Sequence, residues 1–203
     1  MMHKKESYME QILLVRCVPA YAVQIASYRQ ECLDTGSRMD GCGPLRRMED
    51  PMDWVRWCQS WDTDGALPTD MDWVRTTQFL YIRASDNKMV GTIQVRHTLN
   101  QMLAAYGGHI GYSVRPAERR KGYAARMLRE VLPFCRQLGL SRVLITCTPD
   151  NEASRRVILS AGGVYESTVF EADRNRELER YWIDLTPQTK KREKPGEKSE
   201  KSD

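Results

Sequence analysis

The residues best suited to chemistry lie together in segment 118–124, which reads ERRKGYA. This segment places three cations and a glycine between a predicted strand and the first turn of a predicted helix. Unpaired N–H groups and the positive end of the helix dipole stabilise an anion at such a place. Gly122 lets the backbone turn and approach closely, while Arg119, Arg120 and Lys121 add charge-assisted hydrogen bonds. The segment therefore predicts a phosphate-binding turn.

The same seven residues also suit a solvated basic turn that caps a helix, and on their own they leave both interpretations open. A P-loop is excluded, because Gly122 is followed by Tyr123 and the chain contains no Gly-Lys-Ser or Gly-Lys-Thr triplet. The surrounding elements are needed to decide between the two.

Hydrophobic spacing and turn residues predict an ordered series of strands and helices around this segment. Strands are predicted at residues 11–17, 77–84, 89–98, 109–114, 142–147, 164–170 and 179–185, and helices at 20–33, 51–60, 123–138 and 151–161. A loop is expected around 104–107, and Pro133 is expected to kink or shorten its helix. The predicted fold class is α/β (α+β), with a mostly antiparallel sheet, one parallel strand pair and flanking helices.

The pattern Arg119-x-x-Gly122-x-Ala124 resembles the GNAT signature Arg/Gln-x-x-Gly-x-Gly/Ala. GHIGYSVRPAERRKGYAARML is similar to that superfamily's fourth strand, pyrophosphate loop and third helix, and LITCTPDNEASRRVILSAGGV to its fifth strand and fourth helix. The resemblance covers most of residues 77–185, and the chain looks closest to a group of bacterial predicted acetyltransferases. It implies the GNAT fold, with splayed fourth and fifth strands, and acetyl transfer from acetyl-CoA to a primary amine.

The resemblance also implies where acetyl-CoA lies, namely between the splayed strands. Its pyrophosphate is expected on the N–H groups of Arg120, Lys121, Gly122, Tyr123 and Ala124, with Arg119 beside them. Its pantetheine is expected to pair with the backbone of Tyr112, Ser113 and Val114. Asn151 and Ser154 match positions that hold the cofactor at the start of the fourth helix. A helix cap is an alternative role for both residues, and the two roles are compatible.

Acetyl transfer to an amine requires a neutral amine, a stabilised oxyanion and a proton for the departing thiolate. Deprotonating a lysine-like amine costs about 4 to 5 kcal/mol at pH 7, against about 1 for an α-amino group, so only the first needs a dedicated base. His109 stands where many relatives carry a glutamate, which makes it the candidate base. A structural histidine is the alternative, and a register slip of one would place Gly108 there.

The proton donor that many relatives provide is a tyrosine seven residues after the asparagine, and this chain has Ile158 there. Tyr123 is the candidate substitute, with Tyr112, Tyr165 and solvent as alternatives. Cys147 has no companion base in the sequence, so we expect it to be a small buried hydrophobe rather than a nucleophile.

The segment between residues 40 and 73 is rich in Trp and Asp and contains the pentapeptide MDWVR twice, at 52–56 and 71–75. Asp53, Trp54, Asp72 and Trp73 are candidates for an acidic, aromatic pocket for a cationic amine. The favoured interpretation is two amphipathic turns, each of which buries a Trp and a Val.

Length and charge bound the remaining possibilities. The 203 residues suffice for one domain, predicted at 1–185, followed by a charged, disordered tail at 186–203. The net charge of +4 lies partly in that mixed-sign tail, so we expect neither a nucleic-acid nor a membrane partner. Six scattered cysteines without a CxxC pair predict a reduced, cytoplasmic protein without a structural metal. A homodimer is compatible with the sequence.

The predicted function is therefore N-acetylation of a small-molecule primary amine, with acetyl-CoA as co-substrate. Acetylation of a protein N-terminus is an alternative, because it tolerates the lack of a strong base. A non-catalytic acyl-CoA-binding sensor is another, and it predicts binding without turnover.

Overall fold

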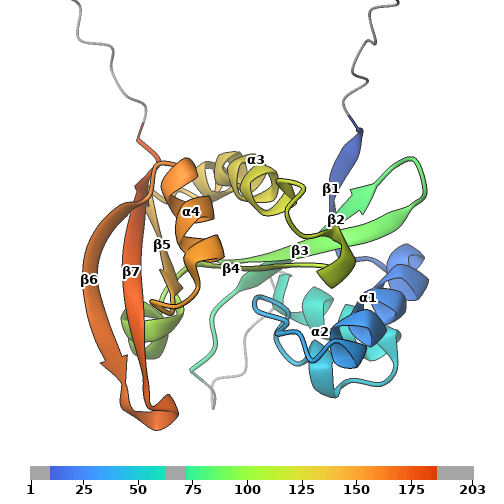
Figure 1. Ribbon diagram of the computed structural model, residues 1–203, viewed down its shortest axis with the longest axis horizontal. Coiled ribbons are helices and arrows are strands. Elements are labelled where there is room, and N and C mark those ends of the chain that lie inside the picture. The colour runs from blue at the N-terminus through green and yellow to red at the C-terminus, as the bar shows by residue number, and fades with distance from the viewer. Residues whose placement is uncertain (1–9, 63–71, 187–203) are drawn as a thin grey trace, which may run out of the picture.

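The computed structural model describes residues 10–62 and 72–186, which form two antiparallel sheets flanked by helices (Figure 1). The first sheet has the order β1-β2-β3-β4 and the second β5-β7-β6. The strands are β1 Ile12–Arg16, β2 Thr76–Arg83, β3 Lys88–Arg96, β4 Ile110–Val114, β5 Arg142–Cys147, β6 Val164–Glu171 and β7 Arg176–Asp184. The helices are α1 Ala22–Asp34, α2 Pro51–Asp62, α3 Tyr123–Gln137 and α4 Glu152–Ser160.

The helices lie on opposite faces of the first sheet: α3 and α4 are on one side, α1 and α2 on the other (Figure 1). Strand β2 is consequently buried on both faces along most of its length. Its alternate side chains divide between two cores. Phe79 and Tyr81 join the core under α3 and α4, whereas Leu80 and Ile82 join the core under α1 and α2. The first core also continues into the second sheet and thereby joins the two sheets.

The predicted elements are confirmed to within a few residues, including the hairpin of β2 and β3. The prediction of a loop around 104–107 was wrong. Residues 103–107 form a short π-helix rather than a loop. Helix α3 continues through Pro133 to Gln137, because Pro133 is exposed and the carbonyl that loses its partner, that of Arg129, lies on the exposed face.

The two MDWVR copies adopt different structures. In the first, which lies in α2, Trp54 and Val55 are fully buried and the Trp54 indole donates to the Cys42 carbonyl at 2.8 Å. In the second, residues 72–75 have no regular secondary structure and Trp73 is 46% exposed. The prediction of a second buried turn is therefore wrong: this copy leads directly into β2, and Trp73 packs against Trp57 and Trp61 of α2 with nearly half of its surface exposed.

The hydrogen-bonded strand pairs of the described residues are all antiparallel, so the predicted parallel pair is not among them. The fourth and fifth strands are instead the facing edges of two separate sheets, as the GNAT resemblance implies. Within the described ranges, no helix has the length and apolar character needed to cross a membrane. Residues 187–203 of the predicted tail lie outside the described part of the chain.

Candidate functional site

Strands β4 and β5 meet at one end only. β4 pairs with β3 and β5 pairs with β7, and a ladder between β4 and β5 is absent from the described residues. The N–H of His109 donates to the Leu144 carbonyl at 2.7 Å, and the N–H of Leu144 donates to His109 Nδ1 at 2.9 Å. Beyond this junction the two strands separate. The junction thus fixes the point from which the facing edges diverge.

His109 is a buried part of this junction, with 6% of its surface exposed. Burial, together with the nearby positive charges of Arg96 and Arg142, lowers its pKa to about 4. Because Nδ1 accepts the Leu144 N–H, the ring proton of the neutral form lies on Nε2. At neutral pH the ring has no free lone pair with which to accept a proton. This geometry suits a structural histidine better than a base.

Gly108 makes the junction possible. Its φ of +67° lies in the left-handed region, and a Cβ there would lie 2.5 Å from the Leu144 carbonyl oxygen. The Arg96 guanidinium donates to the carbonyls of Gly107 and Gly108, at 3.2 and 3.0 Å, and holds the bend in place. The alternative register at this site therefore supplies a backbone contact and no catalytic side chain.

The backbone of β4 alternates between its neighbour β3 and the open edge. Since the Arg115 N–H and the His109 carbonyl both bond to β3, the backbone groups of Tyr112 and Val114 point to the open edge. Those of Ser113 point to β3. The Ser113 side chain points away as well, because its hydroxyl lies 2.7 Å from the Tyr28 hydroxyl. Two of the three residues predicted to pair with pantetheine are thus suitably placed, and Ser113 is not.

The Tyr112 side chain joins β4 to the first turn of α4. Its hydroxyl lies 2.8 Å from Ser154 Oγ, and burial raises its pKa well above the usual value. The Asn151 side chain accepts the Ser154 N–H at 3.1 Å and so caps α4. The structure therefore brings together Tyr112, Asn151 and Ser154 beside the diverging strands.

Helix α3 begins without a side-chain cap. Its N-cap residue, Gly122, has a φ of +79° and nothing within 4 Å of the place where a Cβ would stand. Arg120 also adopts a left-handed conformation, with a φ of +64°. The first N–H groups of a helix have no partner within it, and a glycine cap supplies none. The start of α3 thus presents unpaired donors beside open space, which fits an anionic group.

The chain is similar to known acetyltransferases. Residues 43–164 match the family model described as Acetyltransferase (GNAT) domain, which spans more than half of the chain. The chain belongs to the GNAT family. It is 35% identical over 81 residues to the "Uncharacterized N-acetyltransferase YoaA" of Bacillus subtilis (strain 168). That match covers 39% of this chain and 44% of the relative, less than half of its length.

Solved GNAT structures share the fold. Ribosomal-protein-S5-alanine acetyltransferase from Vibrio fischeri has a TM-score of 0.63 at 17% identity, covering 89% of this chain and 95% of that one. A dodecameric spermidine N-acetyltransferase from Vibrio cholerae has a TM-score of 0.60 at 14% identity, covering 90% and 99%. One neighbour has a protein acceptor in its name and the other a small molecule, so this GNAT fold leaves the acceptor class open.

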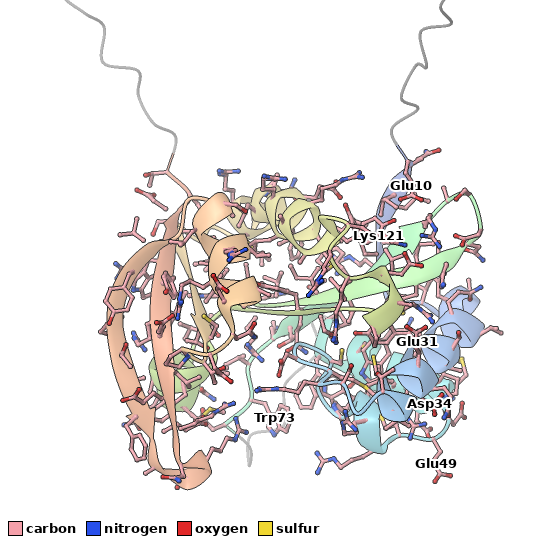
Figure 2. All side chains as sticks on the ribbon, viewed as in Figure 1. Glu10, Glu31, Asp34, Glu49, Trp73 and Lys121 are labelled. Carbon is pink, nitrogen blue, oxygen red and sulfur yellow. The ribbon has the colours of Figure 1, made fainter. Side chains whose placement is uncertain are left out.

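The cations of the GNAT signature segment differ in their surroundings. Lys121 Nζ lies 2.6 Å from Glu118 Oε2, and Arg119 Nε donates weakly to the Val114 carbonyl at 3.4 Å. The Arg120 side chain has no hydrogen bond or ion pair with the described residues. Figure 2 shows Lys121 on the α3 side of the first sheet. Of the three cations, Arg120 is the most available for a phosphate.

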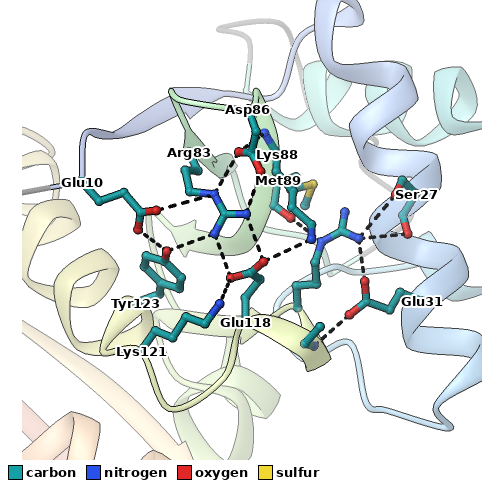
Figure 3. A network of polar contacts seen from close by, with 12 residues as sticks. Glu10, Ser27, Glu31, Arg83, Asp86, Lys88, Met89, Glu118, Lys121 and Tyr123 are labelled. Carbon is teal, nitrogen blue, oxygen red and sulfur yellow. Dashed lines mark hydrogen bonds and ion pairs between the residues drawn. The ribbon is translucent and has the colours of Figure 1, made fainter.

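Tyr123, the predicted proton donor, is not brought to the diverging strands. It is 3% exposed, and its hydroxyl bonds to Glu10 and, at 3.4 Å, to Arg83 near the β2–β3 hairpin (Figure 3). The hydroxyl of Tyr165 bonds to Thr168 on the half-exposed strand β6. Among the tyrosines proposed as donors, Tyr112 has its hydroxyl at the start of α4.

Ile158 and Cys147 are both part of the core. Ile158 is fully buried and Cys147 is 5% exposed, and burial raises the pKa of the Cys147 thiol to about 11. A thiol with such a pKa is a poor nucleophile at neutral pH. Asp53 pairs with Arg56 on the surface and Trp54 is buried, so these two form no acceptor pocket.

Trp73 remains accessible on the α2 side of the first sheet (Figure 2). It stacks on Trp61 with ring centroids 4.9 Å apart, and Trp57 packs edge-on against both rings. This aromatic cluster lies on the sheet face opposite α3.

The sequence did not reveal the charged network around the signature segment. Glu118 contacts Arg83 and Lys88 from the β2–β3 hairpin, and Arg115 contacts Glu31 from α1. These partners are 30 to 84 residues apart, so no local spacing pattern indicates them. Burial lowers the solvation of Glu118, but hydrogen bonds from Lys121, Arg83 and Lys88 outweigh it and bring its pKa to about 2.

Proposed function

We propose that the chain transfers an acetyl group from acetyl-CoA to a primary amine of a small molecule. One observation carries this proposal: the uncapped, left-handed start of α3 lies next to two sheet edges that diverge from the His109–Leu144 junction. When bound, acetyl-CoA supplies an acetyl group activated as a thioester.

The residues that would hold acetyl-CoA divide into two groups. The N–H groups from Gly122 to Ala124, with the side chains of Arg119 and Arg120, would bind the pyrophosphate. The open backbone groups of Tyr112 and Val114 would bind the pantetheine. Asn151 and Ser154 flank the same place from the start of α4.

The acceptor amine must lose its proton with little help from a base. His109 is neutral at pH 7 and its Nδ1 is already bonded to Leu144. An amine with a pKa near 8 loses its proton at a cost of about 1 kcal/mol, against about 4 to 5 for a lysine-like amine. We therefore propose an α-amino group, as in an amino-acid derivative, as the preferred acceptor.

Tyr112 is the proposed proton donor for the departing sulfur. Its hydroxyl lies 2.8 Å from Ser154 Oγ, and its raised pKa keeps it protonated and able to donate. The Ser154 hydroxyl can in turn donate to the tyrosine oxygen when Tyr112 has given up its proton. Tyr112 would thus protonate the thiolate, a role that Ile158 cannot fill because its side chain has no proton to donate.

The loop before α2 favours a small acceptor. A Cβ on Gly41 would lie 2.2 Å from the Gly111 carbonyl, so the two backbones are in direct contact. This contact covers β4 on the face of α1 and α2, and a peptide main chain along that face would have to displace it. A protein N-terminus is the second candidate, because the argument from amine pKa supports it equally.

Thiol release from acetyl-CoA tests this proposal. The panel should contain amino-acid amides, a polyamine and peptides with a free N-terminus. We expect turnover with the small α-amines, lower activity with the polyamine at pH 7 and lower activity with the peptides. A preference for peptides would establish the second candidate. Binding of acetyl-CoA without turnover on any amine would favour a sensor module and contradict the enzyme.

A further inference from the structure

A buried carboxylate lies within the signature segment. Glu118 is 3% exposed, and four contacts surround its two oxygens (Figure 3). Oε2 accepts from Arg83 Nη1 at 2.9 Å and from Lys121 Nζ at 2.6 Å. Oε1 accepts from Arg83 Nη2 at 3.1 Å and lies 3.1 Å from Lys88 Nζ. Three cations from two separate parts of the chain therefore converge on one side chain.

Arg83 extends this contact into the β2–β3 hairpin. Its side chain is 12% exposed and also donates to both carboxylate oxygens of Asp86, at 2.9 and 2.7 Å. Its Nη1 lies 3.4 Å from the hydroxyl of Tyr123, the first residue of α3. Arg83 thus fastens both Glu118 and the start of α3 to the hairpin.

A second fastening holds the other end of the segment. Arg115 is 3% exposed, and its guanidinium donates to Glu31 Oε2 and to the Met89 carbonyl at 2.8 and 2.7 Å. The second oxygen of Glu31 accepts the N–H of Ala117 at 2.8 Å. Residues 115–118 are therefore held by α1 and β3, and residues 118–123 by the hairpin.

A negative charge beside a phosphate-binding turn would repel the phosphate unless cations offset it. Burying a carboxylate is also costly unless hydrogen bonds satisfy it, and Glu118 has both kinds of compensation. Glu118 also has a geometric effect, because it binds the side chain of Lys121. Lys121 lies between Arg120 and Gly122, whose left-handed conformations give the turn its shape.

We propose that Glu118 is a positioning residue for the pyrophosphate of acetyl-CoA. By binding Arg83 and Lys121, it holds the turn in the shape that exposes the N–H groups of the α3 start before the ligand arrives. Lys121 then acts mainly through Glu118, and Arg119 and Arg120 are the cations left for the phosphate. This inference rests on the proposed binding of acetyl-CoA.

The test compares Glu118→Gln with Glu171→Gln in the full chain. Glu171 is a matched control, because it is 5% exposed and paired with Arg174 and Arg176 at 3.2 and 2.5 Å, at the β6–β7 turn. Dissociation constants are measured by calorimetry for acetyl-CoA and for acetyl-pantetheine, which lacks the pyrophosphate. We expect Glu118→Gln to raise the constant for acetyl-CoA roughly tenfold, because a turn that is no longer preorganised must be ordered on binding.

Acetyl-pantetheine should bind equally to the parent and to Glu118→Gln, and Glu171→Gln should match the parent with both ligands. A merely structural role for Glu118 predicts equal losses for both ligands, which would overturn the proposal. So would unchanged acetyl-CoA binding in Glu118→Gln. If the parent itself fails to bind acetyl-CoA, the proposed function fails instead, so the two failures are distinguishable.

If Glu118→Gln does not fold, a second variant, Lys88→Met, tests the positioning role of Glu118. The Lys88 side chain is 35% exposed, and its ammonium pairs with Glu118. Removing it takes away one of the three cations that hold Glu118 and offset its charge beside the turn, so the acetyl-CoA dissociation constant should rise roughly twofold to threefold. An unchanged constant in a folded Lys88→Met protein would then overturn the proposal.

Discussion

Helices α3 and α4 lie on the same side of the first sheet (Figure 1), but the first N–H groups of the two helices have different surroundings. At α4, the Asn151 side chain accepts the Ser154 N–H, and Glu152 places a negative charge in the first turn. At α3, the cap residue is Gly122, which offers no acceptor, and the first turn contains no acidic residue. One helix start is satisfied by its own side chains, and the other is left open.

This difference is the one we expect between a structural helix start and one that binds an anion. Both have the same unpaired donors and the same dipole. At α4 the negative partner of the N–H groups is provided by Asn151 and Glu152 of the chain itself. At α3 the N–H groups face open space, beside two residues in left-handed conformations and several cations. We therefore propose that a ligand, the pyrophosphate of acetyl-CoA, provides the negative partner of α3.

The largest expected effect is at the open start. Gly122→Glu introduces a carboxylate where the pyrophosphate would bind, and a side chain where φ is +79°. Acetyl-CoA affinity measured by calorimetry should fall roughly 100-fold or more, since hydrogen bonds to a charged group are lost and repulsion is added. Gly139→Glu is the matched control, because Gly139 has a φ of +81° and equally open space past the other end of α3. Equal binding by both variants would refute the distinction.

The next effect concerns the hydroxyl that reaches α4. Tyr112→Phe removes the proposed proton donor but retains the ring, so kcat should fall about 100-fold while KM for acetyl-CoA changes little. Steady-state kinetics at saturating amine measure this split. Tyr165→Phe serves as the control, because that hydroxyl bonds to Thr168 and lies on exposed strand β6. A Tyr112→Phe enzyme with unchanged kcat would leave protonation to solvent.

The junction beneath both helices gives a pH-dependent prediction. His109 has a pKa of about 4 in the folded state, against 6.5 in the unfolded chain. As pH falls from about 6.5 to 4, the unfolded chain binds a proton that the folded one does not, so stability decreases by up to about 3 kcal/mol. His109→Gln should flatten this part of the stability profile measured by urea unfolding.

The same variant tests catalysis. Because His109 is buried and neutral, His109→Gln should leave the pH profile of kcat/KM unchanged in shape. A profile that loses its acidic limb in this variant would instead identify His109 as the base.

The smallest effect is expected at the closed start. Asn151→Ala should destabilise the fold by about 1 kcal/mol, because α4 loses its cap. Acetyl-CoA affinity should fall only severalfold, in contrast with Gly122→Glu. Asn151→Ser retains a capping oxygen and should restore most of the stability in thermal unfolding. A loss of affinity in Asn151→Ala as large as that in Gly122→Glu would remove the contrast between the two helix starts.

The sequence predicted those parts of the molecule that depend on neighbouring residues. The strands, the helices and the signature around Gly122 follow from local spacing, and Asn151 was recognisable as a cap because its partner, Ser154, is three residues away. The family resemblance added the splayed edges of β4 and β5.

The contacts between distant residues were not predictable in this way. Arg83 and Glu118 are 35 residues apart, and Tyr112 and Ser154 are 42 apart. Whether a strand residue faces one core or the other depends on the final sheet. For this reason the sequence indicates Tyr123 as proton donor, although the structure points its hydroxyl to the hairpin.

Calorimetric titration of the full chain with acetyl-CoA tests the central claim, that the uncapped start of α3 binds the pyrophosphate of this molecule. We expect one-to-one binding to the parent protein, with acetyl-pantetheine much weaker because it lacks the pyrophosphate. Absence of binding, or equal affinity for the two ligands, would contradict it.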